Sequence, residues 1–352
     1  MFALLSRPRA PFRALLTAFA AMASCVFATS SSAQEIRFFR IGTGSISGVY
    51  FPIGGTIASA ISNPPGARSC DLGGSCGVPG LIAVAQATLG SVANVKAIHS
   101  GNLESALVQA DVAFNAFFGK GTFKGSKRMT GLRAIANLYP EAVHIVVRRD
   151  SPIKSVRDLK GRRVSLDLDG SGTRALALLV LNGYGVDPRK VKQVNSQIGP
   201  ASDRIRLKNI DAFFFVGGFP VGALSRLARD AQIRLIPVDG KEAAAIQGKE
   251  SFLSATRIPA KTYRGVGDTA TVAVNAQWVV SAKVDDETVY GVTLALWHSA
   301  TRRLLDGSVP AAQGIRSDRA LEGLALPLHP GAARYYLDHG MLKDPTKDQG
   351  KN

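Results

Sequence analysis

The chain has 352 residues, of which 46% are hydrophobic and 20% charged, and its formal net charge is +17. This length is enough for two domains of ordinary size. Such a charge permits nucleic-acid binding, but Lys and Arg are scattered and are not interleaved with aromatic residues. We therefore interpret the charge as a solvated basic surface that can steer anionic solutes, and we expect no nucleic-acid partner.

The amino end has the pattern of a secretory signal peptide. Three arginines precede an apolar run over residues 14–28, and small residues follow up to Ala33. The run is shorter than the roughly 20 apolar residues that span a bilayer. We predict that residues 1–33 are removed on export and that the mature protein is periplasmic.

A lipoprotein tether is the alternative, because residues 22–25 loosely resemble a lipobox ending in Cys25. Val26 and Phe27 continue the apolar run beyond that cysteine, which favours cleavage after Ala33.

Two cysteines remain after cleavage, Cys70 and Cys76, in a Gly-containing segment. An even count in an oxidising compartment predicts one disulfide that closes a small loop. The histidines show no metal-ligand spacing, so we expect neither a metal nor a cofactor.

Short β-rich runs then alternate with helical patterns, which predicts an α/β fold with mainly parallel strands. In the first part, strands are expected at 37–41, 81–87 and 106–109. A helix is expected at 49–62, two more begin at caps provided by Ser91 and Asp111, and residues 63–80 form a loop.

The pattern restarts after residue 161. Strands are expected at 163–168, 210–216 and 233–238, and helices at 174–182 and from 217–220 to about 229. A long β-like run covers 271–281, and the tail is helical, most clearly at 289–305.

This order suggests that the chain crosses to a second lobe near Tyr139 and returns near Ser281. Lobe I would then comprise residues 34–139 and 282–352, and lobe II residues 140–281. Two crossing strands between lobes would act as a hinge.

Ligands of open α/β sheets bind beyond the carboxyl ends of the strands. Small-residue turns are expected there at 42–48, 88–91, 109–111, 170–173 and 217–220. Glycines let backbone N–H groups approach a ligand, and helix N-termini favour anions. The turn at 170–173 is followed by Arg174, whose guanidinium suits a carboxylate if it faces the cleft. Each turn could equally be structural.

The sequence resembles the TAXI family, the solute receptors of tripartite ATP-independent periplasmic (TRAP) transporters. The resemblance covers residues 36–340 and rests on motifs in order: Gly42-Thr43-Gly44, Gly48-Val49-Tyr50-Phe51-Pro52, Gly90-Ser91-Val92-Ala93-Asn94, Gln109-Ala110-Asp111, Tyr139-Pro140-Glu141-Ala142, Asp158-Leu159-Lys160-Gly161, Gly170-Ser171-Gly172-Thr173 and His329-Pro330-Gly331.

The resemblance implies a two-lobed periplasmic-binding-protein fold of the second type. It also implies delivery of a glutamate-, glutamine- or dicarboxylate-like ligand to a fused TRAP permease. By position, the ligand-binding residues would be Thr43, Gly44, Gly48, Val49, Tyr50, Ser91, Gln109, Asp111, Ser171, Gly172, Thr173, Arg174, Gly217, Phe219 and Pro220.

Two other functions stay open: an exported α/β enzyme that uses residues 170–173 as an anion cradle, and a ligand receptor for a membrane sensor. The one G-x-S-x-G match, Gly73-Gly74-Ser75-Cys76-Gly77, lies in the loop expected at 63–80 and not at a strand-to-helix turn, where a nucleophile elbow would lie, and the sequence offers no metal-ligand cluster. This pattern favours a receptor over an enzyme.

Overall fold

The computed structural model describes residues 35–343. The predicted signal peptide and Cys25 lie outside this range. Within it, no helix has the length and apolar character that a membrane crossing requires.

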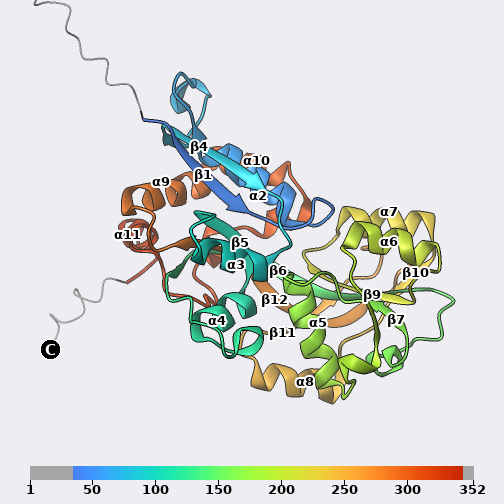
Figure 1. The fold of residues 1–352 in the computed structure, drawn as a ribbon. Coiled ribbons are helices and arrows are strands. Elements are labelled where there is room, and N and C mark those ends of the chain that lie inside the picture. Colours follow the sequence, from blue (N-terminus) through green and yellow to red (C-terminus); the bar gives the residue numbers. More distant parts are fainter. Residues whose placement is uncertain (1–34, 344–352) are drawn as a thin grey trace, which may run out of the picture. The chain divides into compact units, whose positions relative to one another are not determined.

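The strands between residues 35 and 343 form one ten-stranded sheet, in the order β4-β1-β5-β12-β6-β9-β7-β8, with β10 paired to β6 and β11 to β12, and a small two-stranded sheet (Figure 1). Their bounds are β1 Arg37–Gly42, β2 Ser62–Asn63, β3 Val78–Pro79, β4 Leu81–Gln86, β5 Ser105–Gln109, β6 Leu132–Arg148, β7 Arg163–Ser165, β8 Lys192–Val194, β9 Ala212–Gly217, β10 Ile233–Leu235, β11 Ser254–Ile258 and β12 Thr269–Ser281.

Helices cover both faces of the large sheet. They are α2 Tyr50–Ile61, α3 Ser91–His99, α4 Ala110–Phe118, α5 Gly172–Gly183, α6 Ile198–Arg206, α7 Gly222–Asp230, α8 Gly240–Lys249, α9 Asp286–Trp297, α10 Ser299–Asp306 and α11 Pro330–Asp338. Short 3₁₀ helices lie at Cys70–Leu72, Gly121–Phe123, Val156–Leu159, Pro188–Lys190, Pro310–Gly314 and Ser317–Arg319.

Two long antiparallel strands, β6 and β12, connect the two ends of the sheet. The first half of β6 pairs with β12, which also pairs with β5, whereas residues 142–147 of β6 pair with β9. Strand pairs away from these two are parallel, as in β1 with β4 and β5, and β7 with β8 and β9. The predicted α/β fold with two crossing strands is confirmed, while the lobe boundaries stay a prediction.

The strands contribute side chains to separate cores on the two faces of the sheet. In β9, Phe213 and Phe215 belong to the core that also contains residues of α6 and α7, whereas Phe214 and Val216 belong to the core that contains residues of α5. A strand buried on both faces has no polar side, which is why residues 212–217 form a continuous apolar run.

Three local expectations were wrong. The tail helix expected at 289–305 is two helices, because His298 is extended and its Nδ1 accepts the N–H of Ala300 at the start of α10. Ser91 is the first residue of α3, and its hydroxyl accepts the N–H of Gln109. Asp111 lies inside α4, whose N-cap residue is Gln109.

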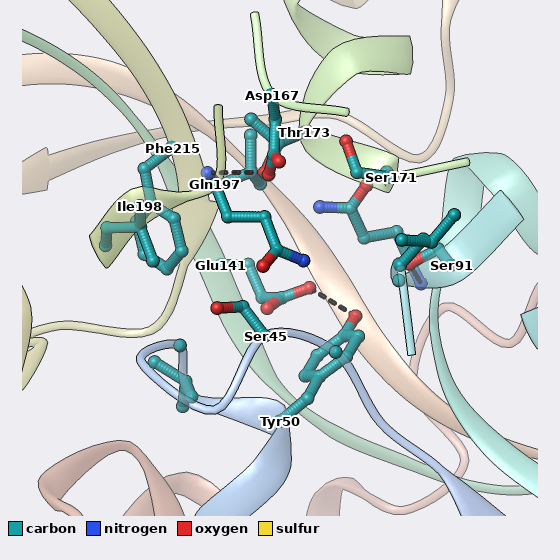
Figure 2. Close-up of a pocket in the computed structure, with 18 residues that line it drawn as sticks. Ser45, Tyr50, Ser91, Glu141, Asp167, Ser171, Thr173, Gln197, Ile198 and Phe215 are labelled. Carbon is teal, nitrogen blue, oxygen red and sulfur yellow. Dashed lines mark hydrogen bonds between the residues drawn. The ribbon is translucent and has the colours of Figure 1, made fainter. Parts of the chain in front are cut away.

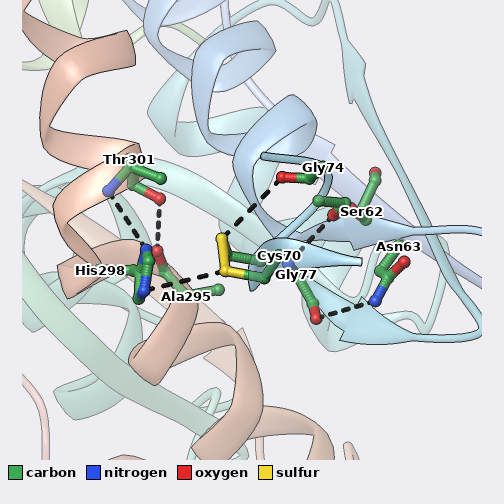
Figure 3. The surroundings of a disulfide bond; sticks show 11 residues. Ser62, Asn63, Cys70, Gly74, Gly77, Ala295, His298 and Thr301 are labelled. Carbon is green, nitrogen blue, oxygen red and sulfur yellow. Dashed lines mark hydrogen bonds between the residues drawn. A yellow bond between two sulfur atoms is a disulfide. The ribbon is translucent and has the colours of Figure 1, made fainter. Parts of the chain in front are cut away.

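The predicted disulfide between Cys70 and Cys76 is present and closes the loop that precedes β3 (Figure 3). The Sγ of Cys70 lies 4.0 Å from Nε2 of His298, at the junction of α9 and α10. The disulfide therefore closes a Gly-rich surface loop that lies beside α9 and α10.

We expect the double substitution Cys70→Ser and Cys76→Ser to lower the free energy of unfolding by about 2–3 kcal/mol, the effect of cross-linking a short loop in the unfolded chain. Neither cysteine lines the cavity described below. Ligand affinity should therefore stay unchanged while urea unfolding shifts to lower concentration. An unchanged unfolding midpoint would contradict this expectation.

Candidate functional site

A cavity of about 60 Å³ lies beyond the carboxyl ends of the parallel strands (Figure 2). One water needs roughly 10–15 Å³ of such space, so the cavity suits a small solute. Its wall consists of Gly44, Ser45, Gly48, Val49, Tyr50, Leu89, Gly90, Ser91, Gln109, Glu141, Asp167, Ser171, Gly172, Thr173, Gln197, Ile198, Phe215 and Val216.

Four helices begin at this wall: α2 at Tyr50, α3 at Ser91, α5 at Gly172 and α6 at Ile198. The first N–H groups of a helix have no partner within the helix, and the helix dipole places partial positive charge there. Because the four N-termini face one cavity, their backbone donors and dipoles together favour an anionic group.

Capping and packing fix the position of these N-termini. The hydroxyl of Ser171 accepts the N–H of Arg174 and starts α5 two residues earlier than the sequence pattern predicted. The hydroxyl of Thr173 accepts the N–H of Val216, which ties α5 to β9. In α3, the buried Asn94 amide donates to the carbonyls of Thr43 and Leu107.

At this cavity, the part of the molecule that contains β5 and α3 contacts the part that contains β7 and α5. The N–H of Ala93 in α3 donates to the carbonyl of Gly170 over 2.9 Å. A Cβ on Gly172 would lie only 2.0 Å from Oε1 of Gln109 and 2.8 Å from Oγ of Ser91. Glycine is therefore required at position 172 for the start of α5 to approach the end of β5 this closely.

Two carboxyl groups also line the cavity. Glu141 of β6 is buried, and its Oε2 accepts the hydroxyl of Tyr50 over 2.7 Å. Burial raises the pKa of Glu141 to about 8, and the nearby Asp111 adds to the shift, whereas the Tyr50 hydroxyl and the Gln109 side chain oppose it. Burial also raises the pKa of Asp167 to about 6.

Nine of the residues proposed from the sequence lie in the cavity wall: Gly44, Gly48, Val49, Tyr50, Ser91, Gln109, Ser171, Gly172 and Thr173. They come from turns at the ends of β1, β4, β5 and β7. The rule that ligands bind beyond these strand ends therefore located this part of the wall.

Six proposed residues lie elsewhere. Thr43 is buried and its hydroxyl donates to the carbonyl of Gln86. Asp111 lines a separate cavity that also contains residues of α5 and the segment after α8. The residues at and just after the end of β9 are also outside the wall: Gly217, Phe219 and Pro220. A Cβ on Gly217 would meet the Phe215 ring at 2.6 Å, so this glycine serves packing.

Arg174 is the sixth, and it is turned away from the cavity. Its guanidinium pairs with Asp169 at 2.7 Å and donates to the side chains of Gln193 and Asn195. These partners hold the guanidinium on the outer side of α5. The sequence analysis expected this guanidinium to face the cleft, whereas the structure places it outside the cavity wall.

We therefore expect Arg174→Ala to change ligand affinity by less than about threefold, since this surface ion pair contributes little and no contact with the cavity is lost. Isothermal titration with L-glutamate, with Thr173→Val as the comparison inside the wall, measures this. A tenfold loss in Arg174→Ala would mean that the guanidinium turns into the cavity.

Nine further residues complete the wall and were not proposed individually: Ser45, Leu89, Gly90, Glu141, Asp167, Gln197, Ile198, Phe215 and Val216. Of these, Ser45, Leu89 and Gly90 lie in the turns expected at 42–48 and 88–91. Glu141 gave a signal, because it is the one acidic residue in the apolar run of residues 134–147. Gln197 and Ile198 gave none, since α6 was not predicted.

The sequence model of the NMT1-like family matches residues 41–340. Among solved structures, a periplasmic aliphatic sulphonate-binding protein from Escherichia coli aligns at 15% identity over 86% of this chain and 83% of that one, with a TM-score of 0.40. The alkanesulfonate-binding protein of Xanthomonas axonopodis pv. citri aligns at 15% identity over 89% and 96%, with a TM-score of 0.45. A binding protein of a phosphonate ABC transporter from Pseudomonas aeruginosa aligns at 13% identity over 78% of both chains, with a TM-score of 0.46.

Proposed function

The chain belongs to the NMT1-like family, and we propose that it is an extracytoplasmic receptor that binds a small carboxylate-bearing solute for a membrane transporter. The observation that carries this proposal is the meeting of four helix N-termini, those of α2, α3, α5 and α6, at one cavity between the crossing strands and the helices beside them.

A carboxylate fits the side of the cavity formed by the start of α5. The N–H groups of Gly172 and Thr173 belong to the first turn of the helix, and the Ser171 hydroxyl lies beside them. A hydrogen bond to a charged group contributes about 1.5–3 kcal/mol, and a helix N-terminus adds about 0.3–1 kcal/mol, more when partly buried. These donors replace the arginine that the sequence suggested.

The residues of the wall also favour binding over catalysis. All of them lie within residues 35–343, and none is a histidine, cysteine or lysine. The hydroxyls of Ser91 and Thr173 each accept a backbone N–H, and neither is hydrogen-bonded to the carboxyl groups of Glu141 and Asp167 in the described part of the chain. A serine without a base is a poor nucleophile, so the arrangement supports a receptor rather than an exported enzyme.

The resemblance to the TAXI family supports a fused TRAP permease as the partner, and the signal pattern at residues 1–33 supports a periplasmic location. A ligand receptor for a membrane sensor would use the same cavity. Uptake of radiolabelled L-glutamate in cells with and without the receptor gene separates the two, because only a transport receptor changes uptake.

Ligand binding is tested by thermal shift and isothermal titration with L-glutamate, L-glutamine and 2-oxoglutarate. A ligand that binds only the folded state stabilises it by about 2.7 kcal/mol at 100 times its Kd. The control is L-glutamic acid α-amide, which lacks the α-carboxylate and should bind more weakly than L-glutamate. If none of the three probes raises the melting temperature at millimolar concentration, or the α-amide binds as tightly as L-glutamate, the carboxylate proposal is wrong.

We further expect the lobes to close on the ligand through a hinge at residues 142–149 and 271–281. Ala93 and Gln109 belong to the predicted lobe I, and they contact Gly170 and Gly172 of the predicted lobe II. These contacts would be lost if the lobes moved apart. Small-angle scattering should therefore show a smaller radius of gyration with saturating L-glutamate than without it. Identical scattering curves would rule out this motion.

A further inference from the structure

The buried end of the cavity is rich in hydrogen-bond acceptors. Glu141 has an exposed fraction of 1%, and one of its carboxylate oxygens accepts the Tyr50 hydroxyl. Oε1 of Gln109 is buried without a partner, and Asp167 lines the same cavity. A buried acceptor without a donor is costly, so Oε1 of Gln109 requires a donor that a ligand can supply.

No basic side chain balances these acceptors. Within residues 35–343, the wall contains no lysine, arginine or histidine. The titratable groups that face Glu141 are Tyr50 from α2, Asp111 from α4 and Tyr139 from its own strand, and none of them carries positive charge. An ionised Glu141 would therefore be buried without a counter-ion in the empty protein.

We propose that Glu141 holds a proton in the empty protein and exchanges it for a protonated nitrogen of the ligand, so that the cavity selects a zwitterionic solute over a dicarboxylate. The inference rests on the proposed function, because it assumes that the ligand binds in this cavity. It assigns the ligand carboxylate to the start of α5 and the ligand ammonium to Glu141, with Gln109 and Asp167 as further acceptors.

The exchange is balanced in charge. Glu141 loses its proton to solvent as the ammonium enters, and the ion pair that forms keeps its hydrogen bond from Tyr50. The ligand ammonium keeps all of its own protons. One proton is therefore released for each ligand bound wherever Glu141 is protonated beforehand.

L-Glutamate and 2-oxoglutarate form a matched pair of probes, because they share a carbon skeleton and differ in an ammonium against a ketone. We expect L-glutamate to bind at least tenfold more tightly. Titrations at pH 7 in phosphate and in Tris, whose ionisation enthalpies differ, should show release of close to one proton for L-glutamate and none for 2-oxoglutarate. The affinity for L-glutamate should rise between pH 6 and pH 8 and level off above, because the pKa of Glu141 is about 8. Equal affinity for the two probes, or L-glutamate binding without proton release, would overturn the exchange.

Two variants locate the proton. Glu141→Gln should abolish proton release and reduce the preference for L-glutamate over 2-oxoglutarate to less than about threefold. Asp111→Asn removes a neighbouring buried carboxyl outside the cavity wall and should keep proton release. Loss of proton release in Asp111→Asn, with release kept in Glu141→Gln, would assign the proton to Asp111 and overturn the proposal.

A measurement without ligand separates this inference from the proposed function. The pKa of Glu141 is raised in the folded protein, so the folded state binds more protons than the unfolded state, and stability falls as pH rises toward 8. The melting temperature of the wild type should fall between pH 6 and pH 9 by several degrees more than that of Glu141→Gln. Parallel melting curves for the two proteins would show that Glu141 holds no proton, whereas failure of every probe to bind, with these curves as expected, would refute only the proposed function.

Discussion

Replacing Gly172 by alanine should weaken binding of L-glutamate by about tenfold to hundredfold. The added Cβ would lie 2.0 Å from Oε1 of Gln109 and 2.8 Å from Oγ of Ser91, so the start of α5 or the Gln109 side chain must move. Such overpacking costs about 1–3 kcal/mol, and about 1.4 kcal/mol is tenfold in affinity. The clash lies at the contact between the two sides of the cavity, so the loss falls on the closed arrangement that we expect ligand binding to require.

Gly248→Ala is the matched control for this variant. Gly248 also lies in a helix, α8, and a Cβ there would have no neighbour within 4 Å. Both variants gain the same methyl group, yet only Gly172→Ala should lose affinity in isothermal titration. If the two variants bind L-glutamate equally, the contact between α5 and Gln109 has no role in binding.

Replacing Trp278 by alanine should lower the free energy of unfolding by about 3–5 kcal/mol, the usual cost of truncating a buried tryptophan. Trp278 lies in the crossing strand β12 and is fully buried. Its indole N–H donates to the Ser105 hydroxyl over 3.1 Å, and its ring packs edge-on against Phe39 with ring centres 6.5 Å apart. The substitution would leave a cavity at the junction of β1, β5 and β12 and remove the donor to the Ser105 hydroxyl, which keeps its own hydrogen bond to the Arg40 carbonyl.

Trp297→Ala serves as the comparison, because Trp297 is only partly buried and lies in α9 at the surface of the tail. Urea unfolding followed by circular dichroism should show a clearly smaller loss for Trp297→Ala than for Trp278→Ala. Equal losses would mean that the crossing strand contributes no more to stability than the tail helices.

The sequence predicted the α/β order and the crossing strands well, because each depends on local patterns. Continuous apolar runs such as residues 212–217 indicate strands covered on both faces, and small residues mark the turns at strand ends. The helix at Ile198–Arg206 was missed because polar and charged residues interrupt its short apolar stripe and its first residues include Gly199 and Pro200. Its absence from the prediction also removed Gln197 and Ile198 from the site.

Side-chain direction accounts for the remaining differences in the site. Arg174 follows the Gly-rich turn directly, yet Asp169 and Gln193 hold its guanidinium on the outer side of α5. Glu141 lies among apolar neighbours in β6. Successive side chains of a strand point to opposite faces, so Glu141 points into the cavity while the side chain of Ala142 points the other way. Gln193 lies 19 residues from Arg174, and Tyr50 lies 91 residues from Glu141, so local sequence patterns do not contain these contacts.

The two ends of a bound ligand should lie against different parts of the cavity wall, and a crystal structure of the protein grown with L-glutamate measures this directly. We predict the α-carboxylate within hydrogen-bond distance of the N–H groups of Gly172 and Thr173, and the ammonium within hydrogen-bond distance of a Glu141 carboxylate oxygen. A glutamate bound outside this cavity, or bound in it with its ammonium away from Glu141 and its carboxylate away from α5, would contradict both assignments.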